Sequence, residues 1–200
     1  MMYLSDVDLK DFINKKIIQV EPSVAEENFR QCGIRVHLSN IIYELSYSNE
    51  VVDLRDHRIM TNDVLLGKLY KKINLQELEN KGQPYILEPG KMILGSTVEK
   101  IKMPDYMVGI LDGRSTVARF GITNNITAAI IDNMNNENPK DITLEISNCG
   151  SLRFVLYPNM PIGMLLFSLL SGRTTISSSG QYSDNQVIPN LQFIHDNNII

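Results

Sequence analysis

Short apolar runs separated by turn residues dominate this chain, and they predict a mainly β fold. Ile34, Val36 and Leu38 alternate with polar neighbours, which is the period of a strand with one buried face. Comparable runs bounded by Pro, Gly, Asn or Asp predict further strands at residues 41–47, 85–87, 92–101, 107–111, 126–131, 142–146, 152–157 and 164–170. Many short strands at such spacing favour a sandwich, a jelly roll or a barrel.

Three segments depart from the strand pattern. Ser5 can cap a short N-terminal helix, on which Leu9, Phe12 and Ile13 fall on one side. Residues 48–82 are charged and carry scattered leucines, so we predict a partly helical insertion there. Residues 173–200 begin as a Ser/Thr/Gly-rich tail, which we expect to be flexible unless a ligand orders it. The predicted organisation is therefore one β domain over residues 1–172, with this insertion and this tail.

Charge and cysteine content narrow the classes of function. The net charge of −4 argues against sequence-independent binding to a nucleic-acid backbone, which needs a basic surface. The two cysteines form no CxxC pair, and the first residues show no apolar signal segment. The longest apolar stretch, around residues 162–170, is too short to cross a bilayer. We therefore expect a reduced, cytoplasmic protein that binds neither nucleic acid nor membrane.

Residues 111–121, which read LDGRSTVARFG, carry the most informative chemistry. Gly113 lets a backbone approach a ligand closely, while Arg114, Ser115 and Thr116 offer the donors that phosphate oxygens need. This signal is weak alone, because a strand-to-helix connection capped by Ser115 would have the same composition.

The order of motifs around this segment resembles the dCTP deaminase family of the dUTPase-like superfamily. A Pro-Gly turn at residues 89–90 precedes LDGRSTVARFG, which matches the family's L-D-G-R-S-S-x-A-R-x-G. Residues 144–148, LEISN, then match the last five positions of V-L-E-F-x-N, and residues 158–163, PNMPIG, match the last six positions of R-P-G-M-x-I-G. The resemblance implies a distorted jelly roll, or β-barrel, of the dUTPase-like type. It also implies a homotrimer, with active sites between subunits, that hydrolyses the 4-amino group of dCTP to give dUTP and ammonia.

The resemblance assigns roles to particular residues. Glu145 matches the catalytic glutamate, a general acid/base, and strand alternation places it opposite Leu144 and Ile146. Arg119 matches the arginine near the reacting centre, and Ser115 matches the serine beside the attacking water. The residues matched to substrate binding are Arg114 and Thr116 at the triphosphate, Thr127 and Ala128 at the pyrimidine edge, Asp132 at the 3′-hydroxyl, and Gln181, Tyr182 and Asn185 in a tail that closes over the phosphates.

The family uses no zinc, and the sequence agrees independently. Its three histidines, His37, His57 and His195, belong to no H-x-E followed by P-C-x-x-C, so the zinc deaminase ligand set is missing. We predict no protein-held metal, with Mg²⁺ carried by the substrate triphosphate. The resemblance further implies dTTP as an inhibitor at the same site.

Departures from the family pattern keep other functions open. The family's D-x-R-L-G reads RVHLS at residues 35–39, its T-A-H-R-I-D-P-G reads TAAIIDNM at 127–134, and its tail lysine is Gln181. Deamination of dCTP is the leading hypothesis. The alternatives are a dUTP diphosphatase, alone or combined with deamination, and a catalytically inactive nucleotide-binding regulator. Glu145 favours deamination, and residues 133–138 lack the tyrosine expected of a pure diphosphatase.

Overall fold

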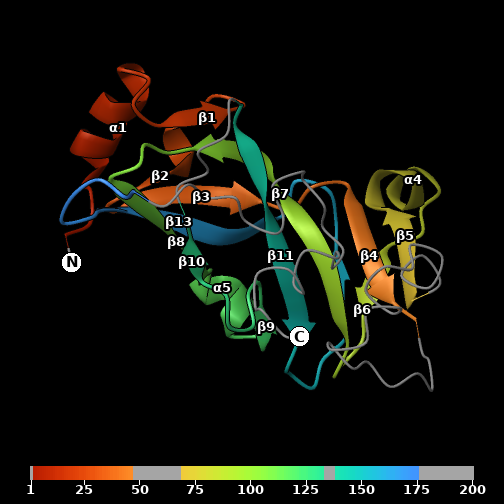
Figure 1. The fold of residues 1–200 in the computed structure, drawn as a ribbon. Helices are drawn as coiled ribbons and strands as arrows, with labels where there is room; N and C mark the ends of the chain where they lie inside the picture. The colour runs from red at the N-terminus through yellow and green to blue at the C-terminus, as the bar shows by residue number, and fades with distance from the viewer. Residues whose placement is uncertain (1, 47–68, 133–137, 176–200) are drawn as a thin grey trace, which may run out of the picture.

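Two β-sheets enclose the core of the protein, and a smaller sheet lies beside them (Figure 1). The computed structural model describes residues 2–46, 69–132 and 138–175. The six-stranded sheet has the order β5-β4-β7-β11-β9, with β1 also paired to β7, and the five-stranded sheet has the order β10-β8-β13-β3-β2. Strands β6 and β12 form the third sheet.

The strands are β1 (Gln19–Glu21), β2 (Phe29–Arg30), β3 (Gly33–His37), β4 (Ile41–Leu45), β5 (Tyr70–Asn74), β6 (Tyr85–Leu87), β7 (Met92–Lys102), β8 (Met107–Gly113), β9 (Ile122–Thr123), β10 (Ile130–Ile131), β11 (Lys140–Asn148), β12 (Phe154–Leu156) and β13 (Pro161–Leu169). The helices are α1 (Asp6–Asn14), α4 (Leu75–Asn80) and α5 (Ser115–Ala118), with a 3-10 turn η1 (Glu26–Asn28). The mainly β fold is thus confirmed, and each predicted strand except that over residues 126–131 has an observed counterpart, although β12 has only half the predicted length.

The N-terminal helix forms as its sequence predicts. The Oγ atom of Ser5 accepts a hydrogen bond from the backbone N–H of Asp8 at 3.2 Å, which satisfies one of the free donors at the start of α1. Leu9 is fully buried, and Phe12 and Ile13 pack against the core. The helix is therefore held to the sheets through one apolar side.

Strand alternation decides which side chains form the core. On β3 the side chains of Ile34 and Val36 are fully buried, and on β11 the same holds for Leu144 and Ile146. The central strand of the five-stranded sheet, β13, pairs with β3 on one side and β8 on the other. This arrangement brings the end of β8, with its LDGRST segment, next to β13.

The strand predicted over residues 126–131 is wrong except for its last two residues. Only Ile130 and Ile131 pair with β8, as β10. Just before them, the side chain of Asn125 already binds the carbonyl of Leu111, which a longer strand would use, and the N–H of Ile126 binds the carboxylate of Glu145. Local side-chain hydrogen bonds therefore replace the strand ladder here.

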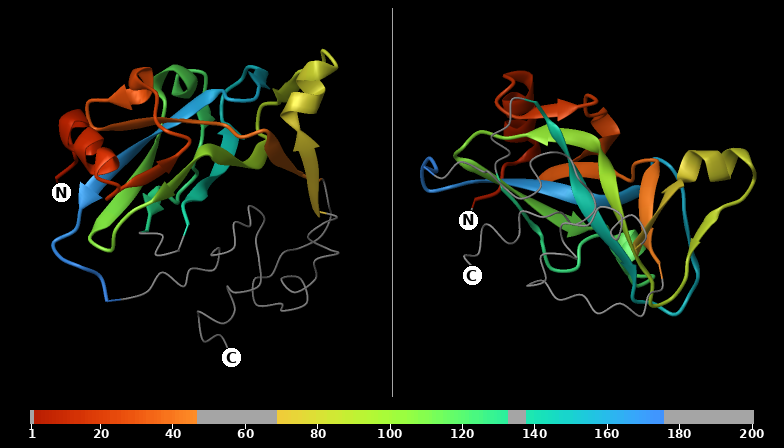
Figure 2. Two further views of the ribbon diagram at one scale, coloured as in Figure 1. Left: turned by 90° about the horizontal axis from the view of Figure 1, so that it is seen from above. Right: turned by 45° about the vertical axis from the view of Figure 1, so that its right-hand side comes forward.

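The described part of segment 48–82 contains β5 and α4, while residues 47–68 lie outside the described residues. Figure 2 shows α4 and β5 at the opposite end of the molecule from α1. Most of the predicted tail, from residue 176, also lies outside the described residues. No helix in the described ranges is long and apolar enough to cross a membrane.

Candidate active site

Glu145 lies on the outward face of β11, as the alternation predicted, and it is half-buried. One turn after β9 holds this residue at two points. The Oε2 atom of Glu145 accepts a hydrogen bond from the backbone N–H of Ile126 at 3.1 Å, and the N–H of Glu145 donates to the carbonyl of Asn124 at 3.0 Å. The carboxylate therefore lies against the backbone at Ile126.

Two asparagines tie the same turn to β8. The Nδ2 group of Asn124 donates to the carbonyl of Asp112 at 3.0 Å, and Nδ2 of Asn125 donates to the carbonyl of Leu111 at 2.9 Å. Asn124 is only 1% exposed. We call residues 124–126 the asparagine turn. The asparagine turn is hydrogen-bonded both to β11, which carries Glu145, and to β8, which ends in the LDGRST segment. Glu145 and the LDGRST segment are therefore held in place by the same turn.

Asn124 and Asn125 are functional candidates that the sequence pattern did not predict. Adjacent asparagines ordinarily signal an exposed turn, since their side chains bind nearby backbone groups. Here the groups that they bind are distant in the sequence. The signal in the sequence was the apolar stretch over residues 126–131. Because a strand formed by this stretch would pair along β8, the asparagines just before it could be expected near β8 as well.

Close packing beside the asparagine turn explains a glycine in β13. A Cβ atom at Gly163 would lie 2.1 Å from Nδ2 of Asn124 and 2.9 Å from the carbonyl oxygen of Asp112. Only glycine leaves room for the amide at this position.

The LDGRST segment turns from β8 into the short helix α5, which lies beside β9 in Figure 1. The N–H of Gly113 donates to Oδ1 of Asp112 at 2.7 Å, and Nη1 of Arg114 lies 3.5 Å from the carbonyl oxygen of Pro161. Ser115 is the first residue of α5, and Arg114 occupies the N-cap position without a side-chain cap. The interpretation of Ser115 as a helix cap is therefore wrong, because its hydroxyl makes no hydrogen bond to another described residue.

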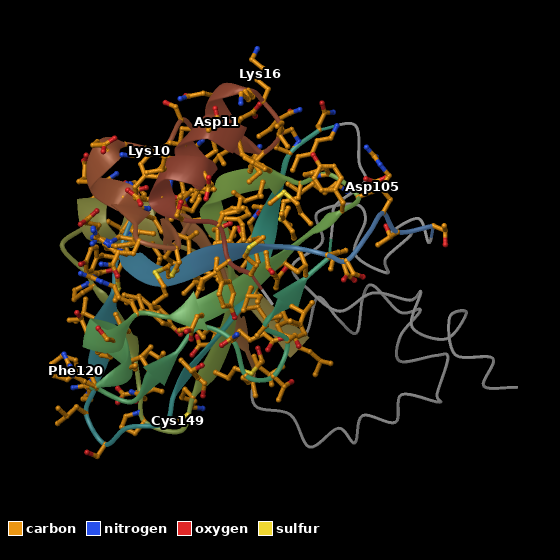
Figure 3. The ribbon with its side chains drawn as sticks, turned by 90° about the vertical axis from the view of Figure 1, so that its left-hand side faces the viewer. Lys10, Asp11, Lys16, Asp105, Phe120 and Cys149 are labelled. Carbon is orange, nitrogen blue, oxygen red and sulfur yellow. The ribbon has the colours of Figure 1, made fainter. Side chains whose placement is uncertain are left out.

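Arg119 follows α5, and its side chain is exposed. Its guanidinium group makes no ion pair or side-chain hydrogen bond within the described ranges. Likewise, no hydrogen bond or ion pair between described residues joins Glu145 to Arg119 or to Ser115. Figure 3 shows Phe120, the next residue, at the end of the molecule that also carries Cys149, away from Lys10 and Lys16 of the α1 region. Within one chain, therefore, the Glu145 carboxylate, the Arg119 guanidinium group and the Ser115 hydroxyl make no direct bond to one another.

The other predicted site residues fall into two sets. Thr127, Ala128 and Asp132 are exposed; Thr127 and Ala128 directly follow the asparagine turn, whereas Asp132 comes after β10. The neighbouring carbonyl of Ala129 accepts the N–H of Leu111 at 2.8 Å, which attaches this segment to β8. Gln181, Tyr182 and Asn185 lie outside the described residues. Among residues 2–46, 69–132 and 138–175, no group of three or more His, Cys, Asp or Glu side chains could hold a metal ion.

A family model and curated relatives that carry the same description match most of the chain. A family model described as dCTP deaminase-like matches residues 3–170. The dCTP deaminase of Haemophilus ducreyi is 32% identical over 184 residues, which cover 86% of this chain and 85% of that protein. The dCTP deaminase of Buchnera aphidicola from Acyrthosiphon pisum is 36% identical over 173 residues, or 85% of each chain.

A solved structure extends the likeness to the fold. The crystal structure of 2'-deoxycytidine 5'-triphosphate deaminase from Agrobacterium tumefaciens matches with a TM-score of 0.58 and 16% identity. The match covers 83% of this chain and 47% of the other, so this chain spans about half the length of that protein.

Proposed function

The chain belongs to the dCTP deaminase family, and on that premise we propose that it hydrolyses the 4-amino group of dCTP to give dUTP and ammonia. The observation that carries the proposal is the placement of Glu145. Its carboxylate is held on the outward face of β11 by the backbone of the asparagine turn, beside the segment assigned to the pyrimidine. A fixed carboxylate next to the ring is what proton transfer at C4 requires.

In the proposed reaction, Glu145 takes a proton from the water that attacks C4 and then delivers a proton to the departing amine. The backbone of Thr127 and Ala128 reads the pyrimidine edge, and Asp132 receives the 3′-hydroxyl. The hydrogen bond from the N–H of Ile126 to Oε2 of Glu145 supports this arrangement, because Thr127 follows Ile126 directly in the chain. Proximity of this kind accounts for much of the rate enhancement of an enzyme.

Ser115 and Arg119 complete the site from a second copy of the chain in a homotrimer. The exposure of both side chains and their lack of described partners support this assignment, since each is available to a neighbouring subunit. Arg119 would orient the attacking water and stabilise the ionised form of Glu145, and Ser115 would bind the same water.

The remaining assignments concern the triphosphate. Arg114 and Thr116 would bind its oxygens, and Gln181, Tyr182 and Asn185 of the tail would close over it. Mg²⁺ would neutralise phosphate charge and would arrive with the nucleotide. We also propose that dTTP competes at this site and that the protein acts in the cytoplasm. The free thiols of Cys32 and Cys149 are compatible with a reducing compartment.

Product analysis tests the activity directly. The purified full-length protein is incubated with Mg²⁺ and dCTP, or with Mg²⁺ and dUTP, and products are separated by chromatography. We expect dUTP from dCTP. Formation of dUMP from dCTP would instead indicate the bifunctional enzyme, and dUMP from dUTP alone a diphosphatase. Nucleotide binding without any product would indicate a regulator and refute the proposed reaction.

The E145Q variant tests the role of Glu145. Glutamine can still accept the hydrogen bond from Ile126, so dCTP affinity should change little, while kcat should fall by about 100-fold or more. The matched control is T143V, because Thr143 lies exposed on the same face of β11. Retained turnover in E145Q, or an equal loss in T143V, would remove Glu145 from its assigned role.

A further inference from the structure

A pocket of about 300 Å³ lies where the segment after β1, the turn η1 and the loop before β13 meet β3 and β7. Such a volume is at the small end of the range for ligand sites. Six of its nine lining residues are polar or charged, and the lining comes from five separate stretches of chain. The lining residues are Pro22, Ser23, Val24, Asn28, Arg35, His37, Val98, Glu99 and Asn159.

Arg35 is the most informative residue of this pocket. It is half-buried on β3, yet its guanidinium group makes no hydrogen bond or ion pair with any described residue. A partly buried arginine ordinarily has an anionic partner, since its planar group presents five donors. Arg35 therefore contributes an uncompensated charge and unused donors to the pocket wall.

The one carboxylate in the pocket wall is already engaged. Oε2 of Glu99 accepts the backbone N–H of His37 at 2.9 Å, and Oε1 lies 2.6 Å from Nδ1 of the same residue. Glu99 is only 7% exposed. The nearby acidic residue Glu26 of η1 is bonded to Lys10 and does not line the pocket. The groups left for a ligand are thus mainly donors: Arg35, the hydroxyl of Ser23, and the amides of Asn28 and Asn159.

This pocket is separate from the Glu145 site. Glu145 pairs with Leu94 of β7, whereas Glu99 lies five residues farther along the same strand. At about 3.3 Å per residue, the two positions are roughly 16 Å apart. Moreover, Arg35 and His37 belong to the stretch RVHLS that departs from the family's D-x-R-L-G, so the family pattern does not predict this pocket.

We propose that the pocket binds a small oxyanion, a phosphate or a carboxylate, through the guanidinium group of Arg35. His37 contributes its second ring nitrogen, Nε2, and Ser23 with Asn28 contributes neutral donors at the rim. Arginine binds both anion types through paired N–H···O bonds, which is why the chemistry of the ligand is stated as an oxyanion.

Isothermal titration calorimetry of the full-length protein tests the proposal, with inorganic pyrophosphate, orthophosphate and citrate as separate probes. At least one probe should bind saturably to the wild type, and the comparison between probes distinguishes a phosphate from a carboxylate ligand. R35Q should weaken that binding about tenfold or more, because it removes charge-assisted hydrogen bonds. The matched control is R30Q, since Arg30 is exposed and its side chain bonds, among the described residues, only to the adjacent carbonyl of Phe29.

Two further variants keep the result decisive. R114Q removes a cation of the LDGRST segment, and probe binding at Arg35 should survive it. N28D places a negative charge at the pocket rim without altering β3, so it should also weaken binding if R35Q fails to fold. Binding that is lost in R114Q but retained in R35Q would place the anion at the other site and overturn the proposal. The absence of saturable binding to the wild type would overturn it as well.

Discussion

Gly163 of β13 allows a quantitative test of how the active site is supported. In G163A the new methyl group would lie 2.1 Å from Nδ2 of Asn124, 2.9 Å from the carbonyl oxygen of Asp112 and 3.3 Å from Cγ2 of Val36. The carbonyl belongs to the β8–β13 ladder, and the amide is buried and bonded to that carbonyl. Moving the Asp112 carbonyl would break the β8–β13 ladder, so the side-chain amide of Asn124 is the group that must move, and it loses its hydrogen bond to Asp112.

The expected cost follows from these contacts. Overpacking a well-filled core costs about 1–3 kcal/mol, and the lost hydrogen bond to Asp112 adds about 1 kcal/mol. A decrease of about 3 kcal/mol in the free energy of unfolding corresponds to about 6–12 °C in Tm for a chain of this length. The control is G113A, because Gly113 lies directly across the ladder and a Cβ there meets nothing within 4 Å. We expect the control to change stability by less than about 1 kcal/mol.

Urea denaturation followed by circular dichroism measures both variants. A double-mutant cycle with N124A identifies the cause, since removing the amide frees the space that the methyl group needs. The two substitutions should then cost at least about 1 kcal/mol less together than the sum of the single effects. Because the carbonyl of Asn124 also accepts the N–H of Glu145, G163A should lower kcat as well. Equal stability of G163A and G113A, or strict additivity in the cycle, would refute the reasoning.

Three further predictions concern the fold. S5A should lower the free energy of unfolding by about 1 kcal/mol, as measured by urea denaturation, because the capping bond to Asp8 is lost; an unchanged midpoint would contradict the cap. G121A should destabilise more than G90A, since both residues have positive φ but only at Gly121 would a Cβ collide with backbone, 2.5 Å from Gly150; the reverse order in thermal melts would be inconsistent with that contact. Burial, together with the nearby Glu44 carboxylate, raises the pKa of Tyr85 well above the ordinary value of a tyrosine, about 10. Folding thus favours the protonated phenol, so stability should be constant below pH 10 and fall as the pH rises above it, and Y85F should flatten this decline where the exposed-site control Y157F does not.

Much of the fold was predictable from local patterns. The alternation of Ile34, Val36 and Leu38 predicted a strand with a buried face, and these side chains are fully buried. The same rule placed Glu145 on the outward face of β11. The N-terminal helix was predictable from Ser5 and the spacing of its apolar residues. Period and capping depend on neighbours in the sequence, which is why they can be read without a structure.

The stretch over residues 126–131 marks the limit of that reasoning. Its composition suits a strand, yet most of it forms none, because Asn125 and Glu145 use hydrogen-bonding groups that a ladder would need. The Leu111 carbonyl that Asn125 binds belongs to β8, and Glu145 belongs to β11. Local propensity cannot report which distant groups compete for the same backbone atoms.

By itself, then, the sequence determined the β-rich fold class, the family through the order of its motifs, and the face on which Glu145 lies. Only the tertiary structure decided that an asparagine turn connects Glu145 to the LDGRST segment, and that Arg35 faces a pocket without a described partner. The physical reason is the range of the interactions involved. Side-chain direction follows from backbone periodicity, whereas hydrogen bonds between strands and the charge balance of a pocket depend on which distant segments the fold brings together.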